Sequence, residues 1–188
     1  MLSLAQMAQL GSWMGRRSFT SIFSHVPGDG KLVANFLSAT ASMGPTFTLV
    51  SISGSAYGVP SNLPPQIIGG YNPFSWIAGT VLTPHDAQRS AFIFNLTRNT
   101  TQSQNLKGQG AADSGKFQAT GGGGAVGFKF GGQDGDIMVA SDLNEGWATN
   151  YSYGGTSAAA PITYGGAVSL TPPKDSFQVN QLDVYTLS

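Results

Sequence analysis

The sequence predicts an α+β protein built on a two-sheet antiparallel β-sandwich, with a few helices beside it. Short segments of alternating apolar and polar residues follow one another along most of the chain, and turns rich in Gly and Pro separate them, as is typical of antiparallel sheets. The two clear helical patterns both lie near the N-terminus. A chain of 188 residues suffices for one domain with a sizeable core, and no internal repeat or linker divides it. We therefore expect a single domain over 1–188.

The first predicted helix covers residues 3–14. Ser3 and Gln6 fit a capping box, Gly15 follows as a stop signal, and apolar residues recur at helical spacing. This stripe, expected to face the core, is Leu4, Met7, Leu10 and Met14. A second helix is predicted at 31–42.

Most of the remaining chain is expected to form strands. The predicted strands are 18–26, 46–52, 66–71, 90–97, 125–131, 136–141 and 162–170. Two of them should supply facing inner surfaces of the sandwich, one through Phe92, Phe94 and Leu96 and the other through Val126, Phe128 and Phe130. The polar, Gly-rich stretch 99–124 is predicted to be a long loop with room for one short strand.

The C-terminal segment 175–188 changes parity along its length. Phe177 and Val179 share one face of an extended chain, whereas Leu182 and Val184 fall on the other. A β-bulge between the two pairs would bring all four onto one face.

Composition excludes several classes of function. Nine basic and nine acidic residues leave no net charge and no basic stripe, so no nucleic-acid partner is expected. The absence of cysteine excludes disulfides and thiolate zinc sites. No apolar run is long enough to span a membrane, and the start lacks the pattern of a signal peptide, so we expect an intracellular protein, cytoplasmic or organelle-associated. Chance explains the glycosylation sequons at Asn95, Asn99 and Asn150 better than use.

The stretch GGTSAAAP at 154–161 matches the signature around the nucleophilic Ser of subtilisin-like proteases. Such an enzyme needs a base and an orienting carboxylate, but neither His25 nor His85 stands in a suitable motif. We therefore interpret Ser157 as a loop hydroxyl and expect no catalytic residue. The acidic turns around Asp134 lack the spacing of a calcium loop, so neither a metal nor a cofactor is expected.

A set of motifs spread over the whole chain closely resembles the TLDc domain. In order, these are GPTFTLVSI, IIGGYNPFSW, AFIFNL, a Gly-Phe strand, Gly-Gly-Gln-Asp before Asp-Ile, and the closing FQVNQLDV, in which Asp replaces the usual Glu. The residues that carry the resemblance are Gly69, Gly70, Tyr71, Trp76, Phe92, Phe94, Gly131, Gly132, Asp136 and Asp183. The two adjacent glycines would admit a close neighbour, and both Tyr71 and Trp76 are expected to anchor the sandwich core.

The resemblance implies a sandwich with flanking helices and no established catalytic centre. Eukaryotic members of the family are linked to oxidative-stress resistance, and several bind the vacuolar proton-pumping ATPase and regulate its assembly. The leading hypothesis is therefore a non-enzymatic interaction module that docks onto protein partners in a larger assembly. A structural subunit of an organellar, ciliary or capsid assembly is the alternative, and a hydrolase acting through Ser157 is the remote one.

Overall fold

The computed structural model describes residues 2–15, 18–54, 65–79, 81–82, 85–106, 118–120, 126–131, 135–149, 153–154, 162 and 175–187. Its helices are α1 (Leu4–Met14), α2 (Val33–Thr40) and the short 3₁₀ helix η1 (Asp86–Gln88). Its strands are β1 (Phe19–His25), β2 (Thr46–Ser53), β3 (Gln66–Asn72), β4 (Val81–Leu82), β5 (Phe92–Asn95), β6 (Thr100–Ser103), β7 (Gln118–Thr120), β8 (Val126–Phe130), β9 (Ile137–Ala140), β10 (Glu145–Ala148) and β11 (Asp175–Leu187).

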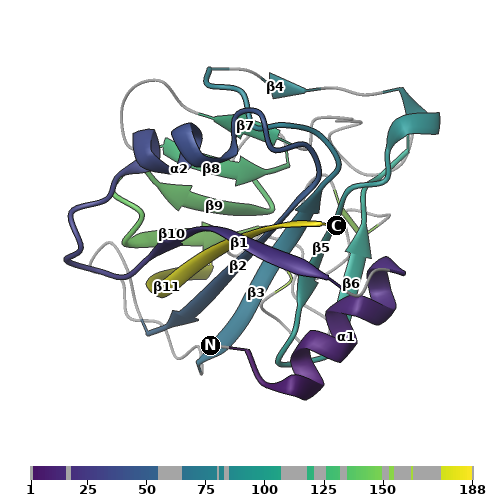
Figure 1. Cartoon of the computed structure of the whole chain (residues 1–188), viewed down its shortest axis with the longest axis horizontal. Helices are drawn as coiled ribbons and strands as arrows, with labels where there is room; N and C mark the ends of the chain where they lie inside the picture. Colours follow the sequence, from purple (N-terminus) through teal and green to yellow (C-terminus); the bar gives the residue numbers. More distant parts are fainter. Residues whose placement is uncertain are drawn as a thin grey trace.

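The strands pair antiparallel in one hydrogen-bonded sheet of eleven strands, which confirms the predicted α+β class (Figure 1). The order is β4-β7-β8-β9-β10-β11-β2-β3-β5-β6, with β1 added beside β11. The sheet folds over itself, because the ring of Phe130 in β8 packs directly on Gly70 in β3, although four strands separate the two in the sheet order. Hydrogen bonds thus join the halves into one sheet, while their packing is compatible with a sandwich.

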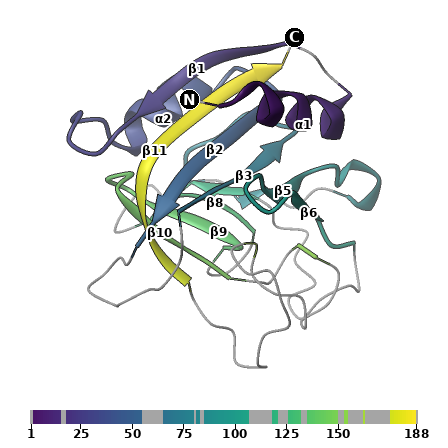
Figure 2. The same ribbon diagram turned by 90° about the horizontal axis from the view of Figure 1, so that it is seen from below.

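The long strand β11 connects the two halves. It pairs with β10 at its start, with β2 along most of its length and with β1 at its end (Figure 2). The register with β2 shifts between Val179 and Gln181, where the predicted bulge lies. Because of this shift, the four apolar residues on both sides of it are buried in one core: Phe177, Val179, Leu182 and Val184.

The main core lies between the two halves of the sheet and under α2. Trp76 is fully buried there, and its ring packs edge-on against Phe36 of α2 and Phe130, each at 5.3 Å between centroids. The indole N–H donates to Thr46 Oγ1 at 3.1 Å, so this large side chain is buried without an unsatisfied donor. Trp76 is therefore the core anchor that the sequence predicted.

A second cluster lies on the opposite face of β2, β3 and β5, beneath α1. Its buried members are Leu10, Phe47, Leu49, Phe94 and Leu96. Phe92, Phe94 and Leu96 share a face as predicted, but that face contacts α1, whereas Ile93 points to the core that holds Phe128 and Phe130. The predicted pairing of the two faces is therefore wrong, because β5 is covered on both sides and alternation alone cannot assign each side.

Helix α1 follows its sequence signals closely. Ser3 Oγ accepts from the Gln6 N–H at 3.2 Å, and Gln6 Oε1 accepts from the Ser3 N–H at 2.9 Å, completing the capping box. Gly15 ends the helix in the left-handed region with φ of 60°, where glycine carries no Cβ penalty.

The stretch 99–124, predicted as a long loop with room for one short strand, contains two strands, β6 and β7, among its described residues. Residues of β6 pair with β5, and residues of β7 pair with both β4 and β8. The exposed side chains of β6 carry no apolar alternation, so its sequence gave no strand signal. Strand β10 was missed because its four residues include Gly146 and only one large apolar side chain, Trp147. Apart from Ile162, the predicted strand 162–170 lies outside the described residues.

The sequon at Asn95 is inaccessible to glycosylation in the folded protein. The side chain is fully buried, and its amide donates to Gln66 Oε1 at 2.5 Å and to the Ile162 carbonyl at 3.0 Å. A glycan needs an exposed amide, so only the exposed Asn99 remains open among the two described sequons. Asn150 lies outside the described residues.

A compact polar turn follows β1. The Asp29 carboxylate contacts His25 Nδ1 at 2.7 Å and Lys31 Nζ at 3.1 Å, and it accepts from the backbone N–H of Val26 and Lys31. Partial burial alone would raise the pKa of the Asp29 carboxyl, but these hydrogen bonds outweigh burial and hold that pKa well below its usual range. The ionised carboxylate therefore stabilises the folded turn.

Replacing Gly70 with Ala is expected to lower the free energy of unfolding by about 2 kcal/mol, the usual cost of overpacking a core. The added Cβ would lie 2.6 Å from ring atoms of Phe130. Urea denaturation measures the resulting loss of stability. In a Phe130→Leu background the same change should cost much less. Equal costs in both backgrounds would contradict the packing of β8 on β3.

The substitution Asp29→Asn is expected to destabilise the protein at neutral pH and to matter less in acid. Because the folded-state pKa is depressed, the stabilisation is present above the unfolded-state value and is lost as pH falls below about 4. Urea denaturation of both proteins across this range measures the difference. A constant difference from neutral to acid pH would refute the role of the ionised carboxylate.

Candidate functional site

The residues singled out from the sequence fall into two groups in the structure. Four lie in or against the main core: Gly70, Trp76, Gly131 and Asp136. Five lie on the face that α1 covers: Gly69, Tyr71, Phe92, Phe94 and Asp183. Gly132 and Ser157 lie outside the described residues.

The adjacent glycines admit close neighbours on opposite faces of β3. A Cβ on Gly69 would collide with the Thr48 carbonyl oxygen and lie 2.8 Å from the Phe94 ring, while one on Gly70 would strike the Phe130 ring. The prediction that Tyr71 anchors the same core as Trp76 is wrong. Tyr71 is half-buried on the α1 face, with its ring centroid 5.6 Å from that of Phe47.

Asp136 is a fully buried carboxylate whose contacts hold neighbouring segments of the chain together. Its Oδ1 accepts from the Tyr153 N–H at 3.2 Å, and its side chain occupies the space that a Cβ on Gly131 would need. Burial, together with the nearby Asp136 charge, raises the pKa of the Tyr153 phenol well above its ordinary value. This arrangement joins the start of β9 to the segment after β10.

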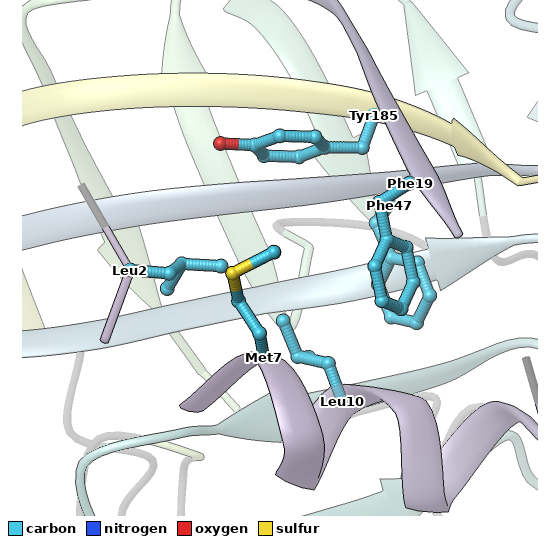
Figure 3. A pocket seen from close by; sticks show the side chains of 6 residues that line it. All are labelled: Leu2, Met7, Leu10, Phe19, Phe47 and Tyr185. Carbon is cyan, nitrogen blue, oxygen red and sulfur yellow. The ribbon is translucent and has the colours of Figure 1, made fainter. Parts of the chain in front are cut away.

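The face of the sheet that α1 covers contains an apolar cavity of about 180 Å³, here called the α1 pocket (Figure 3). Met7 and Leu10 of α1 project into it from one side, with Tyr185 of β11 on the other. Its lining is Leu2, Met7, Leu10, Phe19, Phe47 and Tyr185. The Tyr185 hydroxyl is the one polar side-chain group of this lining, so the pocket is suited to an apolar group with a polar edge.

Phe47 connects this pocket to the residues that the sequence singled out. Its ring packs against Tyr71, Phe92 and Phe94 on one side, at centroid separations of 5.6 to 6.2 Å, and against Phe19 at 5.9 Å. The aromatic residues of the GGY and AFIF motifs therefore support the wall of the pocket from behind.

A carboxylate stands beside the pocket on the same face of β11. After the bulge, Leu182 and Val184 point to the main core, so Asp183 and Tyr185 point to the α1 side. Gln181 Nε2 donates to Asp183 Oδ2 at 2.8 Å. Partial burial and the Asp183 charge raise the pKa of the Tyr185 phenol, which therefore stays a hydrogen-bond donor near neutral pH.

The apolar stripe of α1 extends past the surface that it covers. Leu10 is buried, but Leu4 is 86% exposed and Met7 43% exposed, although the sequence predicted that the whole stripe faces the core. The helix contains no charged residue. An uncharged helix with an uncovered apolar end, beside an open pocket, is the type of surface that a partner covers.

Sequence reasoning found α1, the GGY and AFIF aromatics and Asp183, but it did not find the pocket. Its lining comes from Leu2, α1, β1, β2 and β11, so residues near the start of the chain meet Tyr185 near its end, and no common motif joins them. In the part of the chain that the structure describes, no three acidic or His side chains gather into a possible metal site.

No family model and no curated protein matches this chain. Among its described helices, none is both long and apolar enough to cross a membrane.

The substitution Asp183→Asn is expected to lower the pKa of Tyr185, because it removes the negative charge that opposes phenolate formation. Phenolate absorbance during a pH titration measures the shift, and subtraction of the curve of a Tyr185→Phe variant isolates this residue from the other five tyrosines. Asp142→Asn, which removes a carboxylate elsewhere, is the control. An unchanged Tyr185 pKa would contradict the placement of Asp183 beside the pocket.

Proposed function

We propose that this chain is a non-enzymatic protein-interaction module of the TLDc type, and that it docks onto its partner through α1 and the α1 pocket. The observation that carries the proposal is the uncovered apolar end of α1, where Leu4 and Met7 adjoin an open apolar cavity. Exposed apolar residues around a pocket supply the anchor site on which protein interfaces concentrate their binding energy.

The resemblance to the TLDc family makes the vacuolar proton-pumping ATPase the first partner to test and oxidative-stress protection the first process. The module is proposed to act in the cytoplasm or at an organelle surface. The low charge of the chain, 10% with no net charge, also favours a second candidate, a structural subunit whose surface is covered in a large assembly.

Affinity purification of the tagged protein from its native cells, followed by mass spectrometry, tests the proposal. A Leu4→Asp/Met7→Asp variant is expected to lose the partners that wild type retains, because each new charge would have to be buried at the interface. Leu32→Asp, at an apolar residue that is 52% exposed near the start of α2, is the matched control and should retain them.

The identity of the lost proteins separates the candidates. Subunits of the proton pump support the first, and a constant set of structural proteins supports the second. Partners that are retained equally by all three proteins would contradict docking through α1. Labelling of Ser157 by a fluorophosphonate probe would contradict a non-enzymatic role.

A further inference from the structure

The α1 pocket has a charge beside it that restricts what can occupy it. Asp183 and Tyr185 are two residues apart on the same face of β11, which places them roughly 7 Å from each other along the strand. The effect of the Asp183 charge on the Tyr185 phenol indicates the same proximity. The carboxylate is half-buried, so it is accessible from solvent but lies beside apolar surface.

Asp183 has no cationic partner within the described parts of the chain. Its contact is the Gln181 amide, which is neutral and occupies Oδ2, while the ion pairs that the structure records gather around Asp29. Helix α1, on the other side of the pocket, contributes no charge of either sign. Because Asp183 is a carboxylate without a cationic partner among the described residues, a cation is favoured beside the apolar cavity.

The apolar surface is larger than the cavity. Leu4 does not line the pocket, but it lies one helical turn before Met7 on α1 and is almost fully exposed. A small molecule that filled about 180 Å³ would leave this end of the helix in water. A polypeptide can fill the cavity with one side chain and cover the helix with its neighbours, so a polypeptide fits the surface better.

We infer that the α1 pocket binds a segment of a partner protein that inserts one large apolar side chain and places a Lys or Arg beside Asp183. This inference rests on the proposed function and specifies the chemistry of the partner. The Tyr185 hydroxyl, at the polar edge of the cavity, donates a hydrogen bond to a backbone carbonyl of the same segment. Asp183 selects the basic residue, and the apolar lining selects the anchor.

Selection from a displayed library of random peptides tests the inference directly. Wild-type protein is expected to enrich peptides with a Phe, Leu, Ile or Met anchor and a Lys or Arg within four positions of it. Met7→Trp, which fills the cavity from a residue that is partly exposed, identifies pocket binders, because it should abolish their binding. Thermal unfolding of each variant shows that it is folded.

The role of Asp183 is then measured with one enriched peptide, labelled for fluorescence anisotropy. Asp183→Asn should weaken its binding about fivefold and reduce its salt dependence, as expected for a partly exposed ion pair. Asp142→Asn, which removes the same charge from the turn after β9, should leave both unchanged. The Asp183→Lys variant should bind a peptide whose basic residue is replaced by Glu more tightly than wild type binds it.

The possible failures can be distinguished. Peptides that require the open cavity but show no basic residue, or that bind Asp183→Asn as well as wild type, would overturn the assignment of Asp183 and leave docking through α1 standing. If no enriched peptide is sensitive to Met7→Trp, the pocket is not a peptide site and the inference fails. The proposed function itself fails only if native partners also ignore the α1 variant.

Discussion

The β-bulge in β11 is the constraint on which the rest of the structure depends. This strand is hydrogen-bonded to β10 at one end and to β1 at the other, with β2 alongside, so it carries both halves of the sheet. The register shift before Gln181 changes the parity of the chain, and the Asn180 side chain at this point hydrogen-bonds Ser53 of β2. Without the extra residue, Leu182 and Val184 would leave the main core and Tyr185 would enter it.

The same shift produces the candidate site. It directs Asp183 and Tyr185 to the face beneath α1, where Phe47 joins them to the aromatic residues of β3 and β5. The central strands are therefore buried on both sides, by β8 on one and by α1 on the other. The apolar stripe of α1 extends past the surface that it covers, and its uncovered end with the adjoining cavity is the place proposed for a partner.

The motif residues contribute to this site mainly by supporting it. Gly69 and Gly70 let β3 pack closely on both faces, and Trp76 holds the main core against α2. Phe92 and Phe94 form the layer behind the pocket wall rather than its lining. A motif can thus be essential to an interaction surface without touching the partner, because the shape of the cavity depends on the side chains that pack behind it.

The sequence alone determined the class of the fold, the position of α1 with its caps, most strands to within two residues and the bulge in β11. Each of these depends on local backbone chemistry or on parity along one segment. It could not determine that Phe94 faces α1 while Ile93 faces β8, because alternation identifies two faces but not what covers each. It missed β6 and β10, whose pairing partners rather than their own residues make them strands. The pocket and the proximity of Asp183 to it were decided only by the tertiary structure, because the N-terminal elements α1, β1 and β2 must meet the C-terminal strand β11 before the cavity exists.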